Sequence, residues 1–304
     1  MIDVVIVTDF TSDIQTQDID IPDDDFAKIQ VIYEESLLVF CLENLGLTVV
    51  RAAWDGPFQW DTARCAIIRS TCNNINDVEG FRKWLKDTDK KTKLINSLEI
   101  CDWSTDKKYL TDLENTNIPI VKSMRLSYSD IDNLESFFDR LQTQTIIVKP
   151  FISICDLKIF KIRLDEVVLY RTIIKDLLSK QDLLVQPFME SIVTKGERLF
   201  IVINGKLCHS ALKIAKAGQF RVLERYEWYV LPYAPSDSER QFAENVVRNC
   251  TKKPLYARVD VMLNSDNQML VKDLKLLKPN LFLQFDRRSA DCFAQAIQNI
   301  LNST

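Results

Sequence analysis

Four charged residues alternate with apolar ones in two segments near the C-terminal end of the chain. The segment YARVDVMLN carries Arg258 and Asp260, and the segment MLVKDLK carries Asp273 and Lys275. Apolar alternation on both sides of a polar NSDN stretch is typical of a β-hairpin. A two-residue turn at 266–267 pairs Asp260 with Asp273 and Arg258 with Lys275, about 5 Å apart on one face. This face is either a charge-paired solvent surface or the floor of a site for a metal and an anion.

The two opposed carboxylates are the candidate metal ligands. Such groups repel each other unless a cation or a proton lies between them, and Mg²⁺ is typically held by one or two carboxylates together with substrate phosphates. Asp260 and Asp273 could bind Mg²⁺ in this way, whereas Arg258 and Lys275 could instead neutralise them as a plain ionic cluster. Because Lys275 shares their face, we expect its ammonium group to compete with a divalent cation.

Three further cations stand where regular elements place side chains firmly. Lys149 ends the apolar strand TIIVKP, and Lys107 lies near the start of the expected helix STDKKYLTDLENT, where a cation opposes the helix dipole. Lys213 lies in the second strand of KGERLFIVINGKLCHSALKI, whose Asn-Gly pair is the preferred type I′ hairpin turn. Lys149 is either a solvated strand terminus or an ammonium aimed at phosphate oxygens. Lys107 could have a ligand role, and Lys213 shares the strand face of His209, four residues earlier.

Two strand ends carry groups suited to recognising a small molecule. In LLVQPF, Gln186 to Phe188 close an extended segment whose backbone could bond an adenine edge, or simply end a strand. Arg69 ends the apolar strand CAIIR, where its guanidinium could fork onto a substrate carboxylate or be solvated.

Composition places the chain among soluble globular enzymes. Its 304 residues include 46% hydrophobic and 27% charged ones, enough for a sizeable core and two or three domain-sized units. A net charge of -4 argues against nucleic-acid or membrane partners. No run approaches the length of a membrane span, and the N-terminus MIDVVIVTDF is typical of a strand rather than of a signal peptide. Eight scattered cysteines and one histidine make zinc improbable and indicate a cytoplasmic protein.

The order of elements predicts an α/β unit followed by α+β units. Strands and helices alternate over the first hundred residues, which is the pattern of a parallel sheet with crossover helices. Long antiparallel hairpins follow in the C-terminal half. We place an N-terminal parallel α/β substrate domain at 1–102 and two α+β subdomains at 103–188 and 189–304.

Nine short segments together resemble the ATP-grasp ligases, in the branch of D-cycloserine ligase and prokaryotic glutathione synthetase. In chain order they are RAAWDGPFQW, IIRST, DWSTDKKYLTDL, IPIVKS, TIIVKP, LLVQPF, KGERLFIVINGKLCHSALK, LYARVD and DLKLLKPNLFL. They extend from about residue 47 to residue 283, in the family's order. The resemblance implies the ATP-grasp fold, in which two α+β subdomains clasp a nucleotide, with ATP and Mg²⁺ as cofactors.

The resemblance also implies roles for the nucleotide-facing residues. Lys107 and Lys149 would contact the ATP phosphates. The strand from Gln186 to Phe188 would lie against adenine, and Glu190 or Glu197 would lie near the ribose.

On the reaction side, the resemblance assigns Lys213 and Arg258 to the phosphates and the reacting acyl group. Asp260 and Asp273 would be the magnesium ligands, and Arg69 the anchor for the substrate. The implied activity is ATP-dependent ligation of a small carboxylate to an amine-type nucleophile through an acyl phosphate.

Departures from the branch's pattern support a second hypothesis. Asp273-Leu274-Lys275 and Lys278-Pro279 stand where carboxylates and Glu-Pro are expected, RSTCNN replaces RSTWDY, and a segment normally rich in glycine is here FISICDLKIFK. A fixed ammonium at Lys275 could take the place of a second metal, or it could abolish turnover. In the latter case the protein would be an impaired pseudo-ligase with a nucleotide-binding, regulatory or interaction role.

Overall fold

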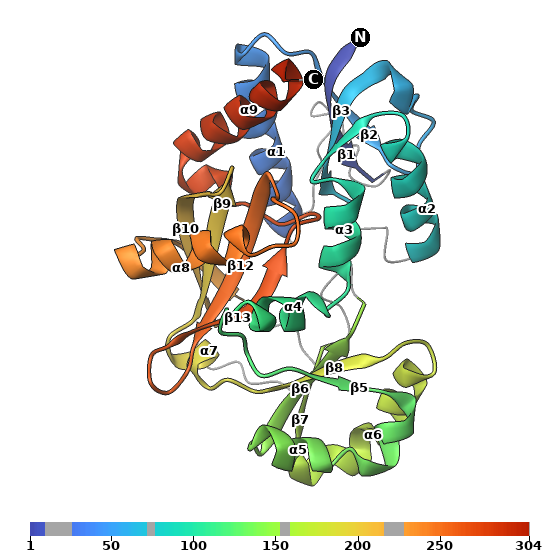
Figure 1. Ribbon diagram of the computed structural model, residues 1–304, viewed down its shortest axis with the longest axis vertical. Coiled ribbons are helices and arrows are strands. Elements are labelled where there is room, and N and C mark those ends of the chain that lie inside the picture. The colour runs from blue at the N-terminus through green and yellow to red at the C-terminus, as the bar shows by residue number, and fades with distance from the viewer. Residues whose placement is uncertain (10–25, 72–76, 153–158, 216–227, 304) are drawn as a thin grey trace.

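The computed structural model describes residues 1–9, 26–71, 77–152, 159–215 and 228–303. Parts of the RSTCNN and FISICDLKIFK segments lie outside the described residues. Three sheets make up the framework. In Figure 1 a parallel sheet lies at the upper end of the molecule, where both chain termini also lie, a small antiparallel sheet lies at the lower end, and a larger antiparallel sheet lies between them.

The first sheet is parallel, as the alternation of strands and helices predicts. Its order is β2-β1-β3-β4. The central strand β1 is buried on both faces, and Val4 to Val7 are fully inaccessible, which is why it is a continuous apolar run. The elements of this unit are β1 (Ile2–Thr8), α1 (Phe26–Asn44), β2 (Val49–Ala53), β3 (Ala63–Ser70), α2 (Val78–Asp89) and the unexpected short strand β4 (Lys93–Ile95).

The second sheet is small and antiparallel, in the order β5-β8-β6-β7. Its apolar face packs against two helices, which lie at the lower end of Figure 1. The elements are β5 (Met124–Leu126), α5 (Ser136–Leu141), β6 (Thr145–Pro150), β7 (Phe160–Arg163), α6 (Val167–Leu178) and β8 (Leu183–Pro187).

The third sheet is antiparallel, in the order β11-β10-β9-β12-β13. Side chains alternate along β9, so Leu199 and Ile201 join the core on the α9 side while Phe200 and Val202 join the core on the α8 side. The elements are β9 (Glu197–Ile203), β10 (Lys206–Ala215), the unexpected β11 (Trp228–Tyr233), α8 (Asp237–Arg248), β12 (Tyr256–Leu263), β13 (Met269–Lys275) and α9 (Arg287–Asn302).

Helix α9 returns to the first sheet and packs against α1, so the end of the chain joins the N-terminal and C-terminal units (Figure 1). Among the described residues, no helix has the length and apolar character needed to cross a membrane.

The prediction of a single helix over STDKKYLTDLENT is wrong. The chain forms two helices, α3 (Leu98–Thr105) and α4 (Tyr109–Asn115), with Lys107 between them. Asp106 is extended and forms a bridge to Ile152, and the Lys107 N–H donates to the carbonyl of Phe151. These contacts with the end of β6 interrupt the helix, and they hold Lys107 beside that strand.

The segment IPIVKSM is also less regular than a strand. Only Met124–Leu126 pairs with β8, whereas Ile120 forms an isolated bridge to Val271 of β13. The remaining short elements are α7 (Ser191–Thr194) and 3₁₀ turns at Trp60–Thr62, Tyr128–Asn133, Leu164–Glu166 and Leu283–Phe285.

The register of the C-terminal hairpin is confirmed, but its turn is not the expected one. Asp260 pairs with Asp273 and Arg258 with Lys275. The strands end at Leu263 and Met269, so the connection is longer than two residues, and the register shifts beyond Asp260. This bulge on β13 offsets the longer turn and restores the predicted pairing.

Candidate functional site

The paired carboxylates of β12 and β13 are buried rather than displayed on a solvent face. Asp260 and Asp273 are each 3% exposed. Val259, Val261 and Leu274 alternate with these aspartates along the two strands. Their side chains face the opposite side of the sheet and join the core beneath α8. Because a buried carboxylate requires cationic partners, the surroundings of these two groups define the site.

Asp273 lies among three lysines that come from different parts of the chain. Its Oδ1 is 2.7 Å from Nζ of Lys107, and its Oδ2 is 3.4 Å from Nζ of both Lys149 and Lys275. Lys107 lies between α3 and α4, Lys149 near the end of β6, and Lys275 at the end of β13. The structure thus brings together Lys107, Lys149 and Asp273, and it places Lys275 on the predicted face.

Tyr109 supports the same carboxylate and was not anticipated from the sequence. Its hydroxyl donates to Oδ1 of Asp273 and accepts a bond of 3.0 Å from the Leu274 N–H. Tyr109 is fully buried at the start of α4. Its position therefore fixes the side chain of Asp273 relative to that helix. In the sequence, Tyr109 belongs to an apolar helix face, which does not indicate this role.

Asp260 forms a two-bond pair with the arginine two residues before it. Nε and Nη2 of Arg258 donate to its two oxygens at 2.7 and 2.9 Å, and Nη1 donates to the carbonyl of Asn280 at 3.2 Å. Lys278, which stands where the resemblance leads us to expect a carboxylate, donates instead to the carbonyl of Thr71 at 2.6 Å.

Glu197 is a third buried carboxylate on the same sheet, and it is 1% exposed. Its oxygens lie 2.7 Å from Nζ of Lys272 and 3.8 Å from Nζ of Lys213. Lys213 also lies over the ring of Trp228, at 4.6 Å from the centroid. The contact with Lys272 was not expected, because the bulge that places this lysine leaves no signature in the sequence.

Burial and the neighbouring cations set the protonation of these groups. Burial would raise the pKa of Asp273, but Lys107, Lys149 and Lys275 hold it well below its usual range. Glu197 behaves likewise, because Lys272 and Lys213 outweigh the effect of burial and lower its pKa. For Asp260, burial dominates and raises the pKa despite Arg258.

The residues expected near adenine and ribose lie along β8 and just beyond it. Gln186 is buried and donates from Nε2 to Oγ of Ser123 at 2.8 Å. Nζ of Lys161 lies 3.6 Å from the centroid of the Phe188 ring, and the nearby Glu190 tends to raise the pKa of this lysine, although burial makes the net shift downward. These contacts leave the nucleotide roles of Gln186, Phe188, Glu190 and Glu197 as predictions.

Arg69 is buried at the end of β3 rather than solvated. Its guanidinium pairs with Glu34 of α1 and lies 6.0 Å from the centroid of the Tyr256 ring. Nε and Nη1 of Arg69 are buried and have no hydrogen-bond partner among the described residues. Its role as a substrate anchor stays a prediction.

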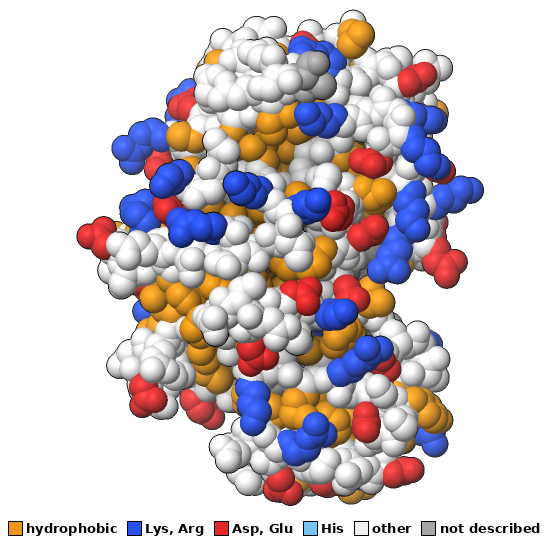
Figure 2. Space-filling model, viewed as in Figure 1, with side chains coloured by type: hydrophobic (Ala, Val, Ile, Leu, Met, Phe, Trp, Pro, Cys, Tyr) orange, Lys and Arg blue, Asp and Glu red, His pale blue; other side chains and the backbone are white. Residues whose placement is uncertain are grey.

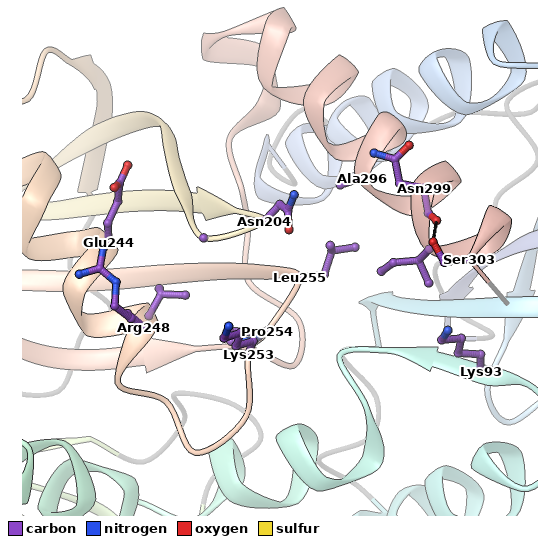
Figure 3. A pocket seen from close by; sticks show the side chains of 13 residues that line it. Lys93, Asn204, Glu244, Arg248, Lys253, Pro254, Leu255, Ala296, Asn299 and Ser303 are labelled. Atoms are coloured by element: carbon purple, nitrogen blue, oxygen red, sulfur yellow. Dashed lines mark hydrogen bonds between the residues drawn. The ribbon is translucent and has the colours of Figure 1, made fainter.

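A cavity of about 580 Å³ lies away from these carboxylates and shares none of their lysines. Figure 3 shows that it opens between the β9–β10 turn, the ends of α8 and α9, and Lys93 of β4. On the face shown in Figure 2, basic and acidic side chains are interspersed with apolar ones. We therefore place the candidate site at the buried carboxylates and their cationic partners, rather than at this cavity or on this mixed surface.

The sheets follow the order that the ATP-grasp fold implies, a parallel sheet and then two antiparallel ones, and lysines from both antiparallel units contact one buried carboxylate. The comparisons agree: the chain has the fold of the ATP-grasp ligases. Residues 6–96 match the family model described as the D-cycloserine synthetase DcsG N-terminal domain.

Similarity to individual proteins extends over almost the whole chain. The cycloserine biosynthesis protein DcsG of Streptomyces lavendulae is 23% identical over 287 residues, which cover 90% of this chain and 95% of that protein. The crystal structure of D-cycloserine synthetase DcsG matches with a TM-score of 0.82 and 20% identity, covering 98% and 99% of the two chains. The ATP-grasp ligase PsnB, in complex with a minimal precursor variant, Mg and ADP, matches with a TM-score of 0.64 and 14% identity, covering 98% of each.

The donor groups of this chain do not fit a magnesium ion as they stand. Both oxygens of Asp260 accept from Arg258, and both oxygens of Asp273 face lysines. No three potential metal-ligating side chains gather anywhere in the described part of the chain. A divalent ion at Asp260 and Asp273 would have to displace tethered cations.

Proposed function

We propose that this protein is an ATP-dependent ligase that joins a small carboxylate to an amine-type nucleophile through an acyl phosphate. The observation that carries the proposal is the convergence of Lys107 and Lys149, from different elements, on the buried face of β13. Lysines fixed in this way are suited to bind phosphate oxygens. Similar solved structures are named a synthetase and a ligase, which supports the same reaction.

The proposed chemistry has two steps, and it uses no nucleophile of the protein. An oxygen of the substrate carboxylate attacks the γ-phosphorus of ATP, the bond to the bridging oxygen breaks, and ADP leaves. The amine then attacks the acyl carbon, the C–O bond to phosphate breaks, and the amine loses a proton. Rate acceleration in such a reaction comes mainly from positioning and from neutralising charge.

Each charged residue has a place in this scheme. Lys107 and Lys149 hold phosphate oxygens of ATP, and Lys213 and Arg258 face the phosphates and the acyl group. Arg69 anchors a substrate carboxylate. In support of this role, two of its buried guanidinium nitrogens have no hydrogen-bond partner among the residues that the structure describes. A cytoplasmic location stays part of the proposal, and the free thiols of the six described cysteines are compatible with it.

The second candidate is a nucleotide-binding protein without turnover. The observation that favours it is the occupation of Asp260 and Asp273 by tethered cations, together with Lys278 in place of a carboxylate. Both candidates bind ATP, so they are separated by turnover rather than by affinity.

Replacing Lys149 with alanine should weaken ATP binding about five- to 150-fold. This range corresponds to the roughly 1–3 kcal/mol of a charge-assisted hydrogen bond. Isothermal titration calorimetry measures the effect, and Lys86→Ala, at an exposed lysine of α2, is the matched control. An unchanged dissociation constant in a folded Lys149→Ala protein would remove this lysine from the site and contradict the proposal.

A further inference from the structure

The three buried carboxylates of this sheet are held by cations of the chain itself. In the described structure, Glu197, Asp260 and Asp273 are paired with Lys107, Lys149, Arg258, Lys213, Lys272 and Lys275. A divalent ion at Asp260 and Asp273 would have to displace these tethered cations, and breaking buried ion pairs is costly.

Among these carboxylates, Asp273 is the one that three ammonium groups surround in the described structure. Its oxygens face these groups, with Nζ of Lys107 at 2.7 Å and those of Lys149 and Lys275 both at 3.4 Å. Lys107, Lys149 and Asp273 have side chains no more than 5% exposed, while that of Lys275 is 21% exposed. The third ammonium is therefore within reach of a ligand that enters beside β13.

Lys275 is held in place by its strand. Lys275 pairs with Arg258 on the neighbouring strand. Asp273 lies two residues before Lys275 on the same strand and faces the same side. A tethered ammonium gives up less freedom than an ion taken from solution when it neutralises a neighbouring anion. It brings one positive charge to Asp273, one of the two carboxylates that would hold a divalent ion together with substrate phosphates.

We infer that this site binds the phosphates of ATP directly through Lys107, Lys149 and Lys275, without a divalent cation on Asp260 and Asp273. The inference rests on the proposed function only in taking ATP as the anion. Asp273 acts as the internal counterion that holds the three lysines together, and the phosphates share these lysines when they bind. Lys275 supplies the charge that a metal ion would supply.

The test is calorimetric titration of ATP into the full-length protein, once with EDTA and once with excess MgCl₂. We expect the two dissociation constants to agree within about threefold, a difference well under 1.4 kcal/mol. In Lys275→Asn, binding in EDTA should weaken about tenfold or more, the effect of losing a charge-assisted bond, and Mg²⁺ should restore at least part of the loss. Lys86→Ala should behave as the wild type in both buffers.

Each other result is decisive. Wild-type binding that is about a hundredfold tighter in Mg²⁺ than in EDTA would overturn the inference and leave the proposed function intact. Equal affinities of Lys275→Asn and wild type in EDTA would also overturn it. If ATP binds in neither buffer while the protein is folded by circular dichroism, the proposed function itself fails, and the inference fails with it.

Discussion

Replacing Asp273 with asparagine should lower the free energy of unfolding at neutral pH by about 3–5 kcal/mol, as for other buried charges left without their partner. The carboxylate is the common counterion of Lys107, Lys149 and Lys275. Asparagine has nearly the same shape but no charge, so three ammonium groups would face one another in a buried site. Chemical denaturation followed by circular dichroism measures the loss.

The same substitution has a defined pH dependence. Because the lysines hold the pKa of Asp273 well below the value of about 3.9 expected in the unfolded chain, its ionised form stabilises the folded state above that pH. This contribution is lost as the pH falls below about 4 towards the folded-state pKa. The difference between wild type and Asp273→Asn should therefore be largest near neutrality and shrink progressively in acid.

The control is Asp266→Asn, in the exposed turn of the same hairpin. It should change the free energy of unfolding by no more than about 0.5 kcal/mol. A loss at Asp273 no larger than that of the control, or one that does not vary with pH, would show that the three lysines do not depend on this carboxylate.

Replacing Glu34 with glutamine should be similarly destabilising, by about 3–5 kcal/mol. Glu34 pairs with Arg69 inside the molecule and accepts from the N–H groups of Leu281 and Phe282 at 3.1 and 2.6 Å. Glutamine would leave the guanidinium uncompensated, and its amide would turn a donor towards groups that donate. Since Glu34 belongs to α1 and the two N–H groups to the chain beyond β13, the change also weakens the junction between the ends of the chain.

Denaturant titration of Glu34→Gln against Glu43→Gln provides the comparison, because Glu43 is an exposed residue of the same helix. Glu43→Gln should be close to neutral. If the two variants unfold at the same denaturant concentration, the ion pair between Glu34 and Arg69 does not hold this junction together.

The parts of the site that were predictable follow from local periodicity. Alternation in the C-terminal hairpin gave the common face of Arg258 and Asp260 on one strand and of Asp273 and Lys275 on the other, and the apolar run TIIVKP gave the strand that ends near Lys149. In both cases the neighbouring residues alone decide which face a side chain takes. The resemblance then supplied the link between segments that are distant in sequence.

The parts that were missed depend on contacts between distant segments. The break between α3 and α4 arises from the bond of Lys107 to Phe151, which no local pattern reveals. The bulge that sets Lys272 on Glu197 and the bond of Tyr109 to Asp273 are likewise tertiary. Arg69 was expected either to be solvated or to meet a substrate, whereas a glutamate 35 residues earlier in the chain accepts from it in the interior.

The most direct test of the account is to follow oxygen from the carboxylate substrate into phosphate. The protein is incubated with ATP, hydroxylamine as the amine-type nucleophile, and each of a panel of small carboxylates labelled with ¹⁸O. For at least one acid, the account predicts equal amounts of ADP and inorganic phosphate, with one ¹⁸O atom in each phosphate formed. Release of AMP and pyrophosphate, phosphate without the label, or no ATP consumption with any acid of the panel would contradict ligation through an acyl phosphate.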